Sequence, residues 1–369
     1  MILAKTYNSA CIHYFSGTGN TSRVAHLIGE GLQRAGCLVH FCNIEHKVDF
    51  SGCKECDLLV FAFPVYSFSP PAIMQRYLRV LPRGQRDDGT KAKAAVIAVH
   101  GASNTRSFWG SGYEGQASSQ ASRIIRGRGY DVFLSDAVGY PANLTQLISP
   151  PSSQDQEEII RQGDLKVDGI LKRILSGEKS IKGCFLPNLL WSGLVGMVFS
   201  LAVHRIGGKL YAADSRCTSC GRCVDGCPVK IIKLLKGRPR WGWNCEACQR
   251  CINICPKGAI QTTIPRLMVQ LLATFLPYSL GLEFTTGYFQ LEMPDLWGSG
   301  ALIRIAGYLI TVYLADLVLY SLESKPLFKG ILALSCTRGF RRYLAPGYDP
   351  LEIESPQEPE TSHIPQVGL

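Results

Sequence analysis

Two runs of cysteines in the second half of the chain have the spacing that an iron–sulfur cluster requires. In each run the cysteines are separated by two, two and three residues, and a proline follows the last one. Three thiolates at two-residue intervals can bind three corners of a cubane cluster, whereas the fourth cysteine, displaced by three residues, points to a second cluster. The first run is Cys217, Cys220, Cys223 and Cys227, and the second is Cys245, Cys248, Cys251 and Cys255.

This spacing predicts two [4Fe-4S] clusters that exchange their fourth ligands. The segment between the runs, 228–244, contains a Lys236-Gly237 turn between short apolar stretches, so it can fold back as a hairpin and bring the runs together. Two structural zinc sites are the alternative, but zinc needs four ligands rather than a repeated run of four that ends in proline. The predicted ligand sets are Cys217, Cys220, Cys223 and Cys255 for one cluster, and Cys245, Cys248, Cys251 and Cys227 for the other.

The cysteine-rich segment resembles the bacterial two-cluster ferredoxins, and every ligand position of that pattern is occupied. The resemblance implies outer-sphere, one-electron transfer. The remaining cysteines lack such spacing and are predicted to be ordinary thiols, although Cys53-x2-Cys56 leaves a redox or metal pair open. These remaining cysteines are Cys11, Cys37, Cys42, Cys53, Cys56, Cys184 and Cys336.

A loop rich in glycine and hydroxyl groups follows the first apolar stretch and precedes a predicted helix. Its backbone N–H groups and the helix dipole favour a phosphate. The loop lacks the lysine of a Walker A loop, and Ser22 stands where a dinucleotide fingerprint needs its third glycine or alanine. Neutral hydroxyls suit a phosphate monoester instead. The predicted phosphate-binding residues are Ser16, Gly17, Thr18, Gly19, Asn20 and Thr21.

Five β-α repeats surround this loop and must position it. Short apolar runs alternate with stretches that are long enough for crossover helices. Such repeats predict a doubly wound parallel sheet with helices on both faces, and ligands of such sheets bind at the carboxyl ends of the strands. The predicted strands are 10–15, 38–44, 57–64, 94–101 and 131–141, and the predicted helices are 21–35, 70–81, 116–128 and 155–175.

The loop and the repeats together resemble flavodoxins. That resemblance implies FMN, with its phosphate in the loop and its ring between two further loops. Tyr66, after the third strand, and Trp109, after the fourth, are the candidate stacking partners, and simple packing is the alternative. The fourth loop departs from the family because it is long and carries Arg106. His100 is either a proton donor or a satisfied structural histidine.

The expected fold class is α/β: a flavodoxin-like doubly wound five-stranded parallel sheet, then an α+β two-cluster ferredoxin domain and C-terminal helices. This order resembles the fused flavodoxin–ferredoxin proteins, which implies electron transfer between carriers of different electron number. The alternatives are a flavin-dependent oxidoreductase with a quinone-type acceptor and a docking module that has lost its cofactor. The predicted boundaries are 1–176 for the flavodoxin-like domain, 177–210 for an apolar connector, 211–263 for the ferredoxin domain, 264–349 for an apolar helical region and 350–369 for a disordered tail.

Composition sets broad limits on the function. The chain has 369 residues, a formal net charge of +10 and 15 cysteines. We expect a cytosolic protein, because the N-terminus lacks a signal-peptide pattern and so many cysteines without a disulfide framework indicate metal binding. The basic residues are scattered, apart from Arg338, Arg341 and Arg342, so we expect a redox partner protein and not a nucleic acid.

Three apolar stretches, 185–203, 264–282 and 301–322, approach the roughly 20 residues needed to cross a bilayer. We expect the first not to span, because it would separate the two domains across the membrane. The other two form either a membrane hairpin with basic, cytosolic flanks or a helical subdomain packed on the ferredoxin domain. Arg266 and Asp316 favour the subdomain, because ionisable groups are costly in hydrocarbon.

Overall fold

The structure is a computed structural model, and its described part falls into two compact units. One unit comprises Met1–Ala142, Pro151–Val198 and Leu344–Leu369, and we call it the sheet unit; the other comprises Asn143–Pro150 and Phe199–Tyr343, and we call it the cysteine unit. The sheet unit thus includes a C-terminal segment that the sequence places far from it. The described residues are 7–45, 50, 56–84, 89–101, 114–183, 186–198, 207–269, 271–272, 299–323, 325, 330–331 and 333–352.

A parallel sheet in the order β2-β1-β3-β4-β5-β6 forms the sheet unit. Its first five strands have the order 2-1-3-4-5 of the flavodoxin-like fold. All five predicted strands are confirmed, and a sixth strand of two residues was not predicted because it is too short to carry a periodic pattern. The strands are β1 (Ser9–Tyr14), β2 (Leu38–Asn43), β3 (Leu58–Pro64), β4 (Lys93–His100), β5 (Asp131–Gly139) and β6 (Ser180–Ile181).

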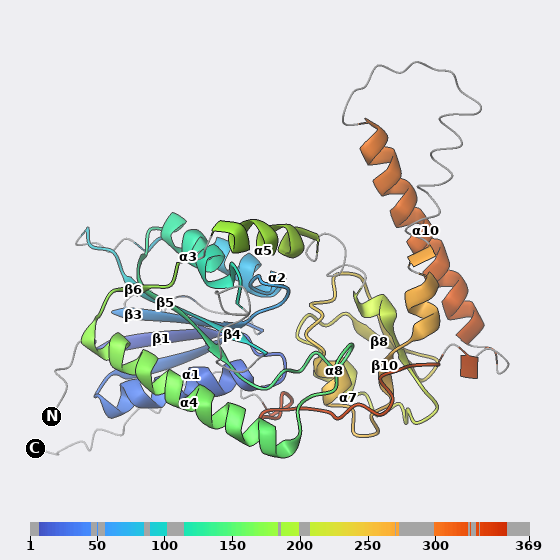
Figure 1. Cartoon of the computed structure of the whole chain (residues 1–369), viewed down its shortest axis with the longest axis horizontal. Coiled ribbons are helices and arrows are strands. Elements are labelled where there is room, and N and C mark those ends of the chain that lie inside the picture. Colours follow the sequence, from blue (N-terminus) through green and yellow to red (C-terminus); the bar gives the residue numbers. More distant parts are fainter. Residues whose placement is uncertain are drawn as a thin grey trace, which may run out of the picture. The chain divides into compact units, whose positions relative to one another are not determined.

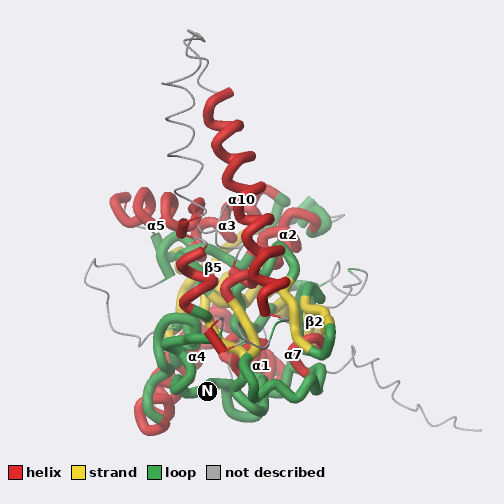
Figure 2. The backbone as a smooth tube through the Cα atoms, turned by 90° about the vertical axis from the view of Figure 1, so that its right-hand side faces the viewer, coloured by secondary structure: helices red, strands yellow, loops and turns green. Residues whose placement is uncertain are grey.

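Helices cover both faces of the sheet, as Figures 1 and 2 show, with α1 and α4 on one side and α2 and α3 on the other. Residues of β1 alternate between these layers, so Ala10, Ile12 and Tyr14 pack with α1 and α4, whereas His13 faces Tyr77 of α2. The helices are α1 (Asn20–Arg34), α2 (Ala72–Val80), α3 (Ala117–Gly127), α4 (Ser153–Ser176) and α5 (Leu186–Val198).

The cysteine unit contains two short antiparallel ribbons of two strands each. The strands of one ribbon are far apart in sequence, and those of the other are adjacent. Strand β7 (Tyr211–Ala213) pairs with β10 (Ile260–Thr262), and β8 (Ile232–Leu235) pairs with β9 (Arg238–Trp241). The predicted hairpin is confirmed: Lys236 and Gly237 connect β8 to β9 with φ of 51° and 73°, the left-handed values of a tight two-residue turn. A 3-10 turn, η3 (Gly207–Leu210), and the one-turn helices α7 (Arg222–Asp225) and α8 (Arg250–Asn253) also belong to this unit.

Helix α10 (Ser299–Glu323) joins the cysteine unit through buried ion pairs. The Asp316 carboxylate accepts from Lys209 Nζ at 2.9 Å and pairs with Arg266 at 3.3 Å, and Arg266 also pairs with Glu323. This helix contains the second arm of the predicted hairpin, 301–322, and Asp316 of that arm pairs with Lys209 and Arg266 of the cysteine unit. Most of the first arm, 264–282, lies outside the described residues.

Among the residues that the structure describes, no helix is both long enough and apolar enough to cross a membrane.

Candidate functional site

The first predicted set of cysteines lies around one pocket at the surface of the cysteine unit. Its open space is about 370 Å³, including solvent at its mouth. Three of the cysteines come from the loop before α7 and from α7 itself, and the fourth follows α8, in the other sequence run. The structure therefore brings together the predicted set across the two runs. The pocket-lining cysteines are Cys217, Cys220, Cys223 and Cys255.

The second predicted set is also brought together, and all of its members are buried. Cys245 and Cys248 precede α8, Cys251 lies within it, and each of these three interacts electrostatically with Cys227, which follows α7. The fourth member again comes from the other run. Cys220 is exposed, so the first set is the one that opens to solvent.

The buried thiols need a positive charge to ionise. Burial, reinforced by the neighbouring cysteines, raises the pKa of Cys223 to about 12, and burial raises the pKa of Cys245 to about 12 as well. Burial also raises the pKa values of Cys248 and Cys251 well above the ordinary value of a thiol. Thiols whose pKa is raised in this way stay neutral unless cations hold them as thiolates, which is what the iron of a cluster does.

Hydrogen bonds from the backbone and from one indole reach cysteine sulfurs of both sets. The backbone N–H groups of Ala247 and Ala259 donate to Cys245 Sγ at 3.4 Å and Cys255 Sγ at 3.3 Å, respectively. The indole Nε1 of Trp241 donates to the Sγ atom of Cys251 at 3.4 Å. Hydrogen bonds to sulfur stabilise negative charge and raise a cluster's reduction potential. The spacing of the cysteines could not predict the contact between Trp241 and Cys251.

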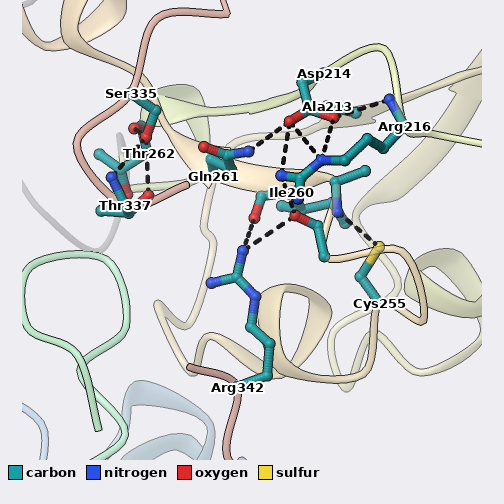
Figure 3. Close-up of polar contacts among 12 residues, drawn as sticks. Ala213, Asp214, Arg216, Cys255, Ile260, Gln261, Thr262, Ser335, Thr337 and Arg342 are labelled. Atoms are coloured by element: carbon teal, nitrogen blue, oxygen red, sulfur yellow. Dashed lines mark hydrogen bonds and ion pairs between the residues drawn. The ribbon is translucent and has the colours of Figure 1, made fainter. Parts of the chain in front are cut away.

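Two arginines hold the segment that carries Cys255. Arg216 Nη2 donates to the Gly258 carbonyl at 2.8 Å, and Arg342 Nη2 donates to the carbonyls of Gly258 and Ile260 at 3.2 and 3.0 Å. Asp214 accepts from Arg216 Nε and Nη2 and orients its guanidinium, as Figure 3 shows. The sequence singled out Arg342 only as part of a basic group, whereas the structure places its charge beside the Cys255 segment.

The predicted phosphate loop, 16–21, lies between β1 and α1 as expected. Ser16 Oγ accepts from the Gly19 N–H at 3.0 Å, and Gly19 precedes α1 with φ of 104°. Ser16, Thr18 and Thr21 are almost completely buried. Hydroxyls at a helix N-terminus are suitable donors for a phosphate monoester, so the chemistry of this donor set fits FMN.

The C-terminal segment 345–348, which belongs to the sheet unit, covers this loop. Ala345 N–H donates to the Thr18 carbonyl at 2.8 Å, and the Tyr348 hydroxyl donates to the Ser16 carbonyl at 3.0 Å. A Cβ atom at Gly19 would lie 2.7 Å from side-chain carbons of Ala345 and Tyr348. The chain thus covers its own phosphate loop, which the sequence did not indicate.

The two loops that the flavin ring would need are only partly described. Tyr66 is half-buried and its backbone pairs with that of Ser69, and α5 packs close to the same loop through Gly196. Trp109 and Arg106 lie outside the described residues, so the predicted stacking pair is not tested. His100 is buried at the end of β4, and this burial lowers its pKa to about 4, which fits a neutral structural histidine.

These observations define a class: a flavodoxin-like sheet fused to an iron–sulfur domain. Residues 209–256 match the family described as a 4Fe-4S dicluster domain, which implies two [4Fe-4S] clusters. No curated protein matches the chain.

Solved flavodoxins are among the similar structures. A flavodoxin from the domain Archaea is 16% identical over 44% of this chain and 99% of that chain, with a TM-score of 0.28. The flavodoxin of Streptococcus pneumonia TIGR4 is 16% identical over 45% and 99%, with a TM-score of 0.30. A mutant flavodoxin from Pseudomonas aeruginosa is 14% identical over 47% and 99%, with a TM-score of 0.32.

Proposed function

We propose that this chain is an electron-transfer protein that carries two [4Fe-4S] clusters and FMN and passes electrons between a low-potential carrier and a partner protein. The observation that supports it best is the composition of the two cysteine groups. Each group combines three cysteines of one run with the fourth of the other. That arrangement suits two neighbouring cubane clusters, which exchange electrons without any bond-making by the protein.

The two cluster sites differ in their access to solvent, which indicates where a partner protein would exchange electrons with the cysteine unit. The set that contains Cys220 opens to solvent, whereas all members of the set that contains Cys248 are buried, and Trp241 covers Cys251 of this set. A partner protein would therefore dock at the open pocket, whose rim includes Leu234 and Lys257. The buried site would pass electrons to or from the exposed one.

The sheet unit would supply a carrier of a different electron number. Bound FMN takes up two electrons, whereas each cluster takes up one. The hydroxyls of Ser16, Thr18 and Thr21 would hold its phosphate, and Tyr66 and Trp109 would contact its ring. Because segment 345–348 covers the loop, FMN binding requires this segment to move away.

Anaerobic purification followed by metal, sulfide and flavin analysis tests the proposal. We expect roughly eight iron atoms and eight acid-labile sulfide ions per chain. The protein should also absorb blue light, and reduction with dithionite should bleach this absorbance. Incubation with FMN should quench flavin fluorescence. Two zinc ions without sulfide would refute the cluster assignment, whereas intact clusters without flavin quenching would refute only the FMN assignment.

A second candidate is favoured by the covered phosphate loop. If segment 345–348 never leaves, the sheet unit is a docking module and the cysteine unit alone carries electrons. The same titration separates the two candidates, because the docking module shows no quenching at any FMN concentration.

We also propose association with a membrane surface through residues within 264–322. The support is exposed apolar surface in the cysteine unit: Met268 and Leu272 are 52% and 64% exposed, and Ile310 and Leu314 of α10 are 59% and 54% exposed. Detergent-free, high-speed fractionation of full-length protein tests this. Membrane association is supported if the protein sediments with the membrane pellet and only detergent releases it. Complete recovery of the protein in the supernatant would exclude membrane association.

A further inference from the structure

Three potential metal ligands meet in the sheet unit, on the face of the sheet that α2 covers, and a fourth residue, Cys56, packs against two of them. Cys11 and His13 lie two residues apart on β1 and so share a face, and the strand register places His13 beside Cys42 of β2. Cys56 immediately precedes the segment that leads into β3. The ligand atoms of Cys11, His13 and Cys42 all lie within 4.8 Å of one another.

The three thiols form one group. Cys11 Sγ lies 3.2 Å from Cys42 Sγ, and Cys56 packs with both and hydrogen-bonds Cys11. In a tetrahedral zinc site with Zn–S distances of about 2.3 Å, two sulfurs are about 3.8 Å apart. The observed separation therefore needs only a small outward rotation of the thiols to admit an ion between them.

His13 has one ring nitrogen available for an ion. Its side chain is fully buried, its Nδ1 atom is hydrogen-bonded to the Tyr77 hydroxyl at 2.7 Å, and its ring stacks on Phe61. Its Nε2 atom has no hydrogen-bond partner among the described residues. A buried nitrogen without a partner is costly, and a metal ion would satisfy it. The tyrosine contact is the kind of outer hydrogen bond that fixes the ring of a metal-binding histidine.

We propose that Cys11, His13, Cys42 and Cys56 bind one Zn²⁺ ion in the sheet unit. Three thiolates and one imidazole form a closed, tetrahedral donor set that is typical of structural zinc. Zinc has no redox chemistry, so the ion would clamp β1, β2 and the entry to β3 together without taking part in electron transfer. A disulfide between Cys11 and Cys42 is the competing arrangement, but it would leave His13 Nε2 without a partner.

Metal analysis of matched variants tests the site in the full-length protein. Wild-type protein should contain about one zinc per chain in addition to its iron. Cys42→Ser and His13→Ala should lose most of this zinc while keeping their iron content. Cys37→Ser is the control, because Cys37 is also a buried cysteine of the sheet unit but packs in the core on the side of α1 and α4. It should retain the zinc.

A spectroscopic measurement keeps the proposal testable if the variants fold poorly. Wild-type protein grown with Co²⁺ should show the intense visible bands of tetrahedral cobalt with thiolate ligands, and Zn²⁺ should displace them. The Cys37→Ser protein should give the same bands. The proposal is overturned if wild-type protein contains no zinc and gives no such bands, if Cys42→Ser keeps the full zinc content, or if mass spectrometry of unreduced protein finds Cys11 and Cys42 joined as a disulfide.

Discussion

The Tyr348 hydroxyl donates a hydrogen bond to the carbonyl oxygen of Ser16 at 3.0 Å, which joins two residues 332 positions apart. Together with the bond from Ala345 N–H to the Thr18 carbonyl, it holds the C-terminal segment on the phosphate loop. The segment would compete with the phosphate that we propose for the same loop. If FMN binds as proposed, its apparent affinity is lowered by the fraction of molecules in which the loop is covered.

Removing the hydroxyl should favour the open loop. Tyr348→Phe deletes a hydrogen bond worth about 1 kcal/mol, so we expect FMN to bind about fivefold more tightly than to wild-type protein. Fluorescence titration measures the change. Tyr313→Phe, a half-exposed tyrosine of α10 in the other unit, is the control and should bind FMN as wild type does. Equal or weaker FMN binding by Tyr348→Phe would show that the segment does not compete.

Double variants should reveal which cysteines share a cluster. Cys220→Ala and Cys255→Ala should each lose about half of the iron, and their combination should lose no more, because both lie at the same pocket. Combining Cys227→Ala with Cys255→Ala should remove nearly all of the iron, although each variant changes only the last cysteine of its run.

Iron and sulfide content after anaerobic purification measures this pattern. Cys336→Ala is the control, because Cys336 is exposed and outside both sets, and it should keep all of its iron. If Cys220→Ala combined with Cys255→Ala instead removed all of the iron, each run would hold its own cluster and the exchange of fourth ligands would be wrong.

The sequence predicted what depends on local patterns. The apolar runs gave all five long strands, and the Lys236-Gly237 turn predicted the hairpin that brings the cysteine runs together. The sequence could not predict the contact between Cys11 and Cys42, because only the strand register brings these residues, 31 positions apart, together. The contact of Tyr348 with the phosphate loop was equally hidden, since no periodicity relates a C-terminal segment to a loop that follows the first strand.

His100 should make the sheet unit sensitive to acid. Burial lowers its pKa to about 4, so the unfolded chain binds a proton more strongly than the folded one. The contribution of neutral His100 to the free energy of unfolding is complete above about pH 6.5, the pKa of histidine in the unfolded chain. It is lost as the pH falls from there towards about 4, at about 1.4 kcal/mol per pH unit. By pH 5 this loss is about 2 kcal/mol.

Hydrogen exchange in β4 measures this effect without relying on the acid-labile clusters. Between pH 7 and pH 5, wild-type protein should lose up to about thirtyfold more protection, relative to the intrinsic exchange rates, than His100→Gln. His40→Gln, which changes a histidine of β2 that is only partly buried, is the control. An equal loss of protection in wild type and His100→Gln would mean that another group causes the acid sensitivity.

Arg342 should raise the reduction potential of the cluster at the open pocket. Its guanidinium is held on the carbonyls of Gly258 and Ile260 and interacts electrostatically with Cys255. An added electron is stabilised by a positive charge about 16 Å away by about 1 kcal/mol at an effective dielectric constant of about 20, and by more at a shorter distance, so 1 kcal/mol is a lower bound. Arg342→Met should therefore lower the potential of one cluster by about 40 mV or more, the one-electron equivalent of that energy.

Redox titration followed by EPR spectroscopy measures the potentials, and two variants separate charge from structure. Arg342→Lys keeps the positive charge and should stay close to the wild-type potential. Arg341→Met removes the neighbouring charge, whose guanidinium binds the Pro150 carbonyl instead, and should change the potential less than Arg342→Met does. Equal shifts in Arg341→Met and Arg342→Met would mean that only the net charge of the unit matters. Equal shifts in Arg342→Lys and Arg342→Met would mean that the two backbone hydrogen bonds, rather than the charge, set the potential.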